Sequence, residues 1–247
     1  MRICVAQTRP AKGDIQTNIK NHKKLIDLAV YNKTDIIIFP ELSITGYEPE
    51  LAKELATDIN DERFDELQKI SNDKHITIGV GMPVKKDMGI LISMIIFQTG
   101  KPRQVYYKQH LHEDEFPYFI GGEKKEPLAE DKIALAICYE LSVPEHAENA
   151  YKTGAEIYLV SVAKSVSGIE KAVETLSGIV NKYSMTVLLS NCVGHCDNFD
   201  CGGKTSIWDD KGILKGQLDD RNEGILIIDT DTQEIIEKLI LENSLQR

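Results

Sequence analysis

Short apolar runs that alternate with segments of helical periodicity dominate this sequence. The run Ile36-Ile37-Ile38 has no polar residue between its apolar ones, as in a strand that is buried on both faces. Residues 17–32 before it have the spacing of one helix face in Leu25, Ile26, Leu28 and Ala29, with Thr17 as the expected N-cap. A chain with this alternation needs sheets that are covered by helices, which indicates an α/β (α+β) fold.

The other elements follow from the same patterns. Strands are expected at residues 3–7, 35–39, 76–80, 90–97, 104–107, 133–137, 157–162 and 186–192. The runs 76–80, 90–97 and 104–107 follow one another without a helix and are predicted to be antiparallel neighbours. Helices are expected at 62–74, at 168–183, and from Pro144 to about 153–154.

The last part of the chain is predicted to be a meander followed by a helix. The expected strands are 204–208, 213–216 and 224–229, with a tight turn at Asp209-Asp210-Lys211-Gly212. Residues 233–241 are expected to form a short C-terminal helix with apolar residues on one face. With no linker-like composition anywhere, residues 1–247 are expected to form a single domain.

Charge and composition exclude several classes of partner. The formal net charge is −10 and the pI is about 5.2, and such a surface repels phosphate backbones, so no nucleic-acid partner is expected. The N-terminal residues lack a signal-peptide pattern and no apolar run reaches the length of a membrane span, which predicts a cytoplasmic protein without a membrane partner. The five cysteines are an odd number and are expected to be free thiols.

Three expected strands each end in a chemically active side chain. Glu41 brings a carboxylate after the 35–39 run, Lys108 an ammonium after the 104–107 run, and Cys138 a thiol after the 133–137 run. Cys138 also opens a turn before the helix that begins at Pro144, which leaves the N–H groups after it free to hold an oxyanion. These three positions together indicate one active site.

The three groups suit covalent acyl transfer to water. A thiol attacks a carbonyl as the thiolate, so Glu41 would take its proton while the Lys108 ammonium favours the anion. The oxygen of the tetrahedral intermediate is expected between the Lys108 ammonium and the Tyr139 backbone N–H. Glu41 would then protonate the leaving amine and activate the water that hydrolyses the thioester. This chemistry needs no metal and no organic cofactor.

In this order, the three motifs resemble those of the nitrilase superfamily of carbon–nitrogen hydrolases. The matching segments are Phe39-Pro40-Glu41 with Thr45-Gly46-Tyr47, Tyr107-Lys108-Gln109-His110-Leu111, and Cys138-Tyr139-Glu140 with Pro144-Glu145. Asn191-Cys192-Val193-Gly194 and Gly203-Lys204-Thr205-Ser206 are similar to two late strands of the family, so the resemblance covers nearly the whole chain. It implies that Glu41 is the general base, Lys108 the oxyanion stabiliser and Cys138 the nucleophile.

The resemblance also implies supporting site residues. Family members carry a second glutamate after the lysine, for which Glu115 is the best match and Glu113 the fallback. That glutamate would orient Lys108 and the substrate. Tyr139 is expected to help bind the oxyanion, and Tyr47 and Lys164 lie in loops expected to bind substrate. Lys164 could pair with a substrate carboxylate, although a lone lysine is more often solvated.

A tyrosine after the nucleophile and a compact chain resemble the amidase and N-carbamoyl-amine hydrolase branches of the superfamily. The implied substrate is a small linear amide or N-carbamoyl amine, and the implied product is ammonia. The implied fold is a four-layer α-β-β-α sandwich that pairs into a homodimer.

Two alternative functions do not depend on the chemistry of Glu41, Lys108 and Cys138. Cys192, His195, Cys196 and Cys201 offer soft ligands for zinc or thiols for a redox response, but their spacing is not that of a C-x-x-C knuckle, so no metal site is predicted. A catalytically silent relative that acts as a binding protein is the third alternative.

Overall fold

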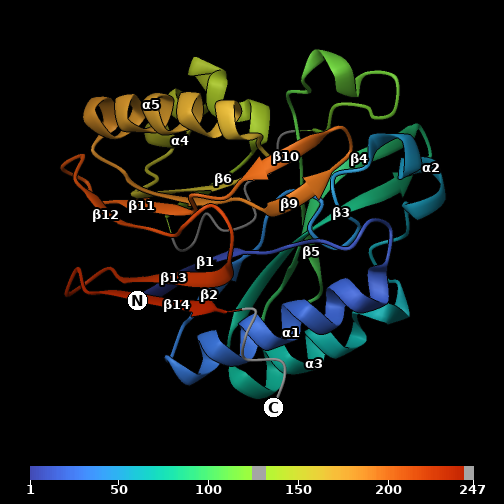
Figure 1. Cartoon of the computed structure of the whole chain (residues 1–247), viewed down its shortest axis with the longest axis horizontal. Helices are drawn as coiled ribbons and strands as arrows, with labels where there is room; N and C mark the ends of the chain where they lie inside the picture. Colours follow the sequence, from blue (N-terminus) through green and yellow to red (C-terminus); the bar gives the residue numbers. More distant parts are fainter. Residues whose placement is uncertain (124–131, 242–247) are drawn as a thin grey trace.

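The computed structural model describes residues 1–123 and 132–241, and these form two β-sheets stacked between two layers of helices (Figure 1). Within these residues, the larger sheet has the strand order β14-β13-β1-β2-β3-β4-β5 and the smaller has the order β12-β11-β8-β7-β6. Helices α1 and α3 cover the outer face of the larger sheet, and α4 and α5 cover the outer face of the smaller one (Figure 1). The predicted α-β-β-α sandwich is therefore confirmed.

The larger sheet contains β1 (Arg2–Gln7), β2 (Ile36–Ile38), β3 (Thr77–Lys86), β4 (Gly89–Phe97), β5 (Gln104–Tyr107), β13 (Glu223–Asp229) and β14 (Ile235–Ile240). The smaller sheet contains β6 (Ile133–Ile137), β7 (Ile157–Ser161), β8 (Thr186–Ser190), β11 (Ser206–Trp208) and β12 (Leu214–Gln217), and a separate hairpin contains β9 (Val193–Cys196) and β10 (Phe199–Gly202). The helices are α1 (Ile15–Tyr31), α2 (Ala52–Leu55), α3 (Asp65–Lys74), α4 (Pro144–Lys152) and α5 (Val166–Tyr183), with 3₁₀ turns η1 (Pro49–Leu51), η2 (Glu62–Phe64), η3 (Glu113–Glu115) and η5 (Cys138–Ser142). Among the described helices, none has both the length and the apolar character needed to cross a membrane.

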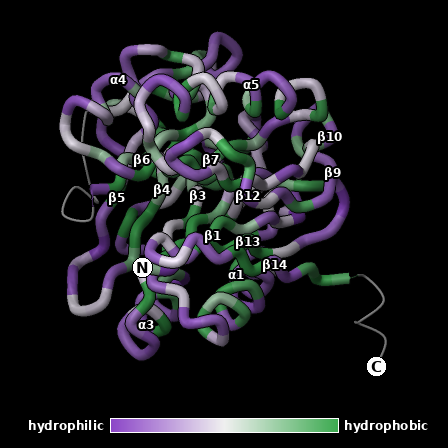
Figure 2. The backbone as a smooth tube through the Cα atoms, turned by 90° about the vertical axis from the view of Figure 1, so that its left-hand side faces the viewer, coloured by the Kyte–Doolittle hydropathy of each residue, from purple (hydrophilic) through white to green (hydrophobic). Residues whose placement is uncertain are grey.

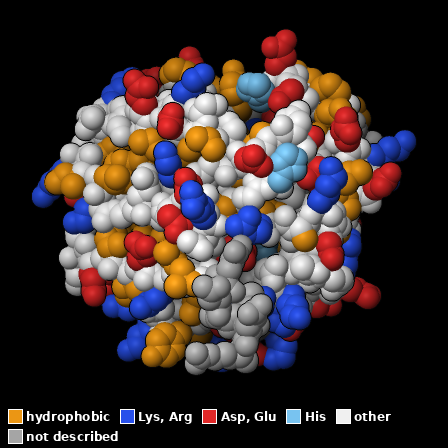
Figure 3. Space-filling model, viewed as in Figure 1, with side chains coloured by type: hydrophobic (Ala, Val, Ile, Leu, Met, Phe, Trp, Pro, Cys, Tyr) orange, Lys and Arg blue, Asp and Glu red, His pale blue; other side chains and the backbone are white. Residues whose placement is uncertain are grey.

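Alternating side chains of the strands build the separate cores of the sandwich. On β1, Ile3 and Val5 face the core between the two sheets, whereas Cys4 and Ala6 face the core under α1 and α3. Tyr158 and Val160 on β7 pack under α4 and α5. Figure 2 shows the hydrophobic strands inside and more hydrophilic stretches towards the outside, and Figure 3 shows acidic and basic side chains mixed over one face. Strands that are buried on both faces explain the uninterrupted apolar runs.

Several predicted features are confirmed and one cap is corrected. Strands β3, β4 and β5 are antiparallel neighbours, and residues 209–212 connect β11 to β12. Helix α1 begins at Ile15, earlier than predicted, because Asp14 rather than Thr17 is its N-cap: the Asp14 carboxylate accepts a hydrogen bond from the Thr17 backbone N–H.

The predicted C-terminal helix is wrong, because residues 235–240 form strand β14 on the edge of the larger sheet. Ile235 and Leu239 pack on the core between the sheets, while Ile236 and Ile240 pack on the helix side. Residues i and i+4 share a face in a strand as well as in a helix, so the apolar spacing could not distinguish the two.

The predicted meander is wrong in part. Strands β11 and β12 pair with each other, but β13 crosses to the larger sheet and pairs with β1 and β14. The hydrogen-bonding edge of β1 therefore receives a strand that is about 220 residues away in sequence, a pairing that no local pattern predicts.

Candidate active site

The three predicted site residues converge from both sheets. Glu41 lies shortly after β2 and Lys108 directly after β5 in the larger sheet, and Cys138 lies directly after β6 in the smaller sheet. The Lys108 Nζ lies 2.7 Å from the Glu41 Oε1, and Cys138 is near enough to Glu41 that the carboxylate charge raises the pKa of the thiol. The ends of three strands thus bring a thiol, a carboxylate and an ammonium together between the sheets.

Lys108 is enclosed by carboxylates. Its Nζ donates to the Glu41 Oε1 at 2.7 Å and to the Glu115 Oε1 at 2.6 Å, and all three side chains are fully buried or nearly so. The Tyr47 hydroxyl also donates to the Glu115 Oε1, at 3.0 Å. Glu115 therefore lies beside Lys108, whereas Glu113 is exposed on the same 3₁₀ turn.

Cys138 is held in an unusual backbone conformation. Its φ is +44°, in the left-handed region that a residue with a Cβ seldom adopts, at the point where β6 gives way to η5. At this turn Cys138 packs both against the core between the sheets and against the core under α4 and α5. The predicted turn after the strand is confirmed.

Burial and neighbouring charges set the resting protonation of these groups. Burial raises the pKa of Glu41 above its ordinary value, against the opposing effect of Lys108. Burial and the Glu41 charge raise the pKa of Cys138 to about 12, although Lys164 and Lys108 favour its anion. Burial alone would lower the pKa of Lys108, but Glu41 and the charge of Cys138 as a thiolate outweigh it and raise that pKa. At neutral pH the site therefore holds a neutral thiol and an ammonium.

Glu140 has a supporting place that the sequence analysis did not identify. This buried carboxylate accepts from the backbone N–H of Ile137 at 2.7 Å and of Gln109 at 2.6 Å. It also accepts from the Tyr106 hydroxyl at 2.7 Å. Since Ile137 precedes Cys138 and Gln109 follows Lys108, one side chain fixes the backbone beside both. A glutamate two residues after the cysteine was the available signal.

The Glu41 loop is fixed by close backbone contact with β3. Leu42 has a φ of +50°, and the Ile44 N–H donates to the Gly81 carbonyl at 3.0 Å. A Cβ on Gly81 would lie 2.2 Å from the Leu42 nitrogen, so only glycine allows this approach. The loop that presents Glu41 therefore has little freedom to move.

The remaining predicted residues differ in position. Tyr139 is 36% exposed and its ring meets His112 edge-on. Lys164 is half-buried; its backbone N–H donates to the Asn191 Oδ1 at 3.0 Å, and its charge lowers the pKa of Cys138. Tyr47 contacts the site through the hydrogen bond that its hydroxyl donates to Glu115. Asn191, whose part in holding Lys164 was not predicted, lies in the segment that resembles a late strand of the nitrilase superfamily.

Three cysteines lie together and take no part in the hydrogen bonds of Glu41, Lys108 and Glu115. The sulfur atoms of Cys192, Cys196 and Cys201 all lie within 4.8 Å of one another, and among the described residues this is the group of ligand-type side chains that could hold a metal ion. His195 does not join them, because its Nδ1 lies 3.0 Å from Asp200 on the exposed face.

Comparison with known proteins identifies a matching family and relatives that include an amidase. Residues 2–238 match the carbon–nitrogen hydrolase family model. The 2-oxoglutaramate amidase of Bacillus subtilis is 25% identical over 91% of this chain and 88% of its own length. The glutamine-dependent NAD(+) synthetase of Aquifex aeolicus is 26% identical over 98% of this chain, which spans less than half (44%) of that relative.

The fold is also similar to that of a solved amidase structure. An amidase of Nesterenkonia sp. AN1, with an acetamide moiety on its active-site cysteine, superposes with a TM-score of 0.82 at 21% identity, over 93% of this chain and 90% of that one. At that identity the likeness shows the shared fold. The family model, by contrast, spans nearly the whole sequence, and the chain therefore belongs to the carbon–nitrogen hydrolase family.

Proposed function

We propose that this protein hydrolyses a small linear amide or N-carbamoyl amine and releases ammonia through a thioester on Cys138. The observation that carries the proposal is one buried site in which the Lys108 ammonium donates to the Glu41 carboxylate and the charge of that carboxylate acts on the Cys138 thiol. A second carboxylate, from Glu115, holds the ammonium from another side.

The reaction begins when the Cys138 thiol passes its proton to Glu41 as its sulfur attacks the substrate. The sulfur attacks the amide carbon, and the negative charge that develops on the amide oxygen is stabilised by the Lys108 ammonium and the Tyr139 backbone N–H. Glu41 returns its proton to the leaving nitrogen, and the C–N bond breaks to give ammonia and a thioester. Water then attacks the thioester, Glu41 takes its proton, and the acid leaves as the thiol re-forms.

The raised pKa values of Cys138 and Glu41 support this order of events. A thiol with a pKa of about 12 does not ionise at rest, so its proton moves only as the sulfur attacks. A carboxylate with a raised pKa is a stronger base than one in water. The Lys108 ammonium, whose pKa is raised, keeps its charge throughout.

Two relatives suggest which amides to test first. One is a 2-oxoglutaramate amidase and another depends on glutamine, and each of those names denotes a compound with an ω-amide on a dicarboxylic acid skeleton. Lys164 is half-buried and close enough for its charge to act on Cys138, which suits the carboxylate of such a compound. We therefore propose ω-amides of dicarboxylic acids as the first substrate class, ahead of N-carbamoyl amines.

Ammonia release from a panel of small amides, ω-amides, N-carbamoyl amines and aliphatic nitriles tests this function. Cys138→Ala should abolish release, whereas Cys4→Ala, which removes a buried thiol under α1, should retain it. Mass spectrometry of the wild-type chain with a slow substrate should show the acyl group on Cys138. Release that survives Cys138→Ala would overturn the mechanism. Failure of the whole panel, with Cys138 alkylating no faster than a free thiol, would favour a silent binding protein.

A further inference from the structure

The β9–β10 hairpin gathers three thiols on one of its faces. Cys192 and Cys196 flank Gly194 at two residues on either side, and Cys201 pairs with Gly194 across the hairpin. Alternation along the strands therefore directs the three side chains to the same side. All three are at least 96% buried and pack in the core between the sheets.

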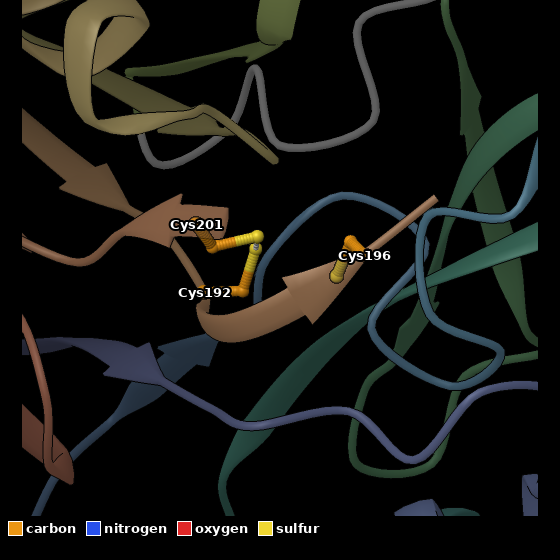
Figure 4. A group of neighbouring side chains, drawn as sticks. All are labelled: Cys192, Cys196 and Cys201. Atoms are coloured by element: carbon orange, nitrogen blue, oxygen red, sulfur yellow. Dashed lines mark hydrogen bonds between the residues drawn. The ribbon is translucent and has the colours of Figure 1, made fainter. Parts of the chain in front are cut away.

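Two of these thiols lie in especially close contact. The Cys192 Sγ donates to the Cys201 Sγ at 2.8 Å, and Figure 4 shows the two sulfur atoms facing each other. That separation exceeds the length of a disulfide bond by only about 0.8 Å. The two sulfurs therefore lie close to bonding distance.

A metal ion fits this cluster less well. Structural zinc takes four ligands in a tetrahedron, and the described residues supply three. His195 is next to Cys196 in sequence but points to the opposite, exposed face of β9, where it pairs with Asp200. Three thiolates around a divalent ion would also leave a net negative charge in an apolar core, which is unfavourable without a partner.

We propose that Cys192 and Cys201 form a reversible disulfide when the protein meets hydrogen peroxide. A disulfide is neutral and apolar, so unlike a thiolate–metal site it adds no charge to the core that the three cysteines share. Cys196 remains the third, unpaired thiol, within 4.8 Å of both sulfurs.

The chemistry balances with peroxide as the two-electron oxidant. One thiol gives up its proton as its sulfur attacks a peroxide oxygen, which forms an S–O bond and breaks the O–O bond, and the hydroxide released takes up that proton as water. The second sulfur attacks the sulfenic sulfur, which forms the S–S bond and expels the second water. Two thiols lose two electrons and two protons, and one peroxide becomes two waters.

The bond would join two segments that hold a residue of the proposed active site. Asn191, next to Cys192, accepts from the Lys164 N–H at 3.0 Å. Gly202, next to Cys201, donates its N–H to the Lys164 carbonyl at 2.9 Å. Oxidation would therefore link covalently the two neighbours that position the Lys164 backbone.

The test uses the full chain with Cys138→Ala, which removes the other thiol near this region and leaves Cys4, Cys192, Cys196 and Cys201. The native protein is treated with hydrogen peroxide, quenched, denatured and alkylated. We expect two of the four thiols to be lost, a mass lower by two hydrogens, and a Cys192–Cys201 peptide pair that a thiol reductant restores. Four reactive thiols after treatment, or oxygen added to these sulfurs instead of the bond, would overturn the proposal.

Single serine variants identify the pair. In the same background, Cys196→Ser should still lose two thiols, whereas Cys192→Ser and Cys201→Ser should lose none. A disulfide that includes Cys196 or Cys4 would overturn the assignment, as would a stoichiometric metal ion that survives desalting and protects the thiols. The peptide mapping does not use the serine variants, so it decides the question even if one of them fails to fold.

Discussion

Replacing Lys108 with Met removes the positive charge that lies between two buried carboxylates. The Nζ is 2.7 Å from the Glu41 Oε1 and 2.6 Å from the Glu115 Oε1, and none of the three side chains is more than 1% exposed. Met keeps most of the side-chain length, so the change is chiefly electrostatic. Removal of one partner from a buried ion pair destabilises a protein by about 3–5 kcal/mol. We expect Lys108→Met to lower the free energy of unfolding by about that amount at pH 7.

The loss should depend on pH in a defined direction. Burial raises the pKa of Glu41 and Lys108 opposes that shift, so the folded-state pKa rises further when Lys108 is removed. A carboxyl group whose folded pKa is raised favours the folded state below its unfolded pKa and loses that stability as pH rises through the folded pKa. The stability deficit of Lys108→Met should therefore be largest at neutral pH and shrink as the pH falls towards the ordinary range of a glutamate.

A second substitution separates charge repulsion from lost packing. Adding Glu115→Gln to Lys108→Met leaves one buried carboxylate in place of two. We expect the double variant to recover on the order of 1–2 kcal/mol, since each unit by which the Glu41 pKa relaxes contributes about 1.4 kcal/mol. If packing were the cause, the second substitution would recover nothing.

Urea unfolding followed by the fluorescence of the buried Trp208 measures these differences at pH 5 and pH 7.5. Lys152→Met is the matched control, because Lys152 forms an exposed ion pair with Glu148 and its loss should change stability by less than about 0.5 kcal/mol. A deficit of less than about 1 kcal/mol for Lys108→Met, or an equal deficit at both pH values, would refute the reasoning.

Three further predictions concern the proposed reaction and the loops that support it. The value of kcat/KM should rise with pH through an apparent pKa above that of an ordinary glutamate. The reason is that burial raises the pKa of Glu41, whose carboxylate is the proposed base. A rise in kcat/KM with an apparent pKa at or below the ordinary value would contradict that role. Glu140→Gln should lower kcat by about 10- to 100-fold with little change in KM, since hydrogen bonds to a charged group contribute about 1.5–3 kcal/mol. Steady-state kinetics that show a change in KM alone would argue that Glu140 does not position the backbone beside Lys108 and Cys138. Gly81→Ala should lower both the melting temperature and the activity, because the new Cβ would lie 2.2 Å from the Leu42 nitrogen. Gly178→Ala in α5 is the control: its Cβ would meet no atom within 4 Å, so it should stabilise the helix by roughly 0.5–1 kcal/mol.

Much of the fold was predictable because most strands are short apolar runs that are buried on both faces. Ile36-Ile37-Ile38 is an example, as its side chains divide between the core that separates the sheets and the core under the helices. The segment 235–240 misled the prediction because its apolar spacing fits one face of a helix and also both faces of a strand. The β9–β10 hairpin was not predicted, since its glycine, histidine and aspartate interrupt any apolar alternation.

The sequence by itself determined the family motifs, the order of the candidate residues, and the position of each at the end of a strand. It could do so because strand ends and turn residues leave local signals. Only the tertiary structure decided that Glu115 rather than Glu113 lies beside Lys108, that Glu140 supports both sides of the site, and that Cys192 contacts Cys201. Those facts depend on contacts between residues from different strands and turns, and side-chain direction at such contacts is set by the stacking of the two sheets rather than by the neighbouring sequence.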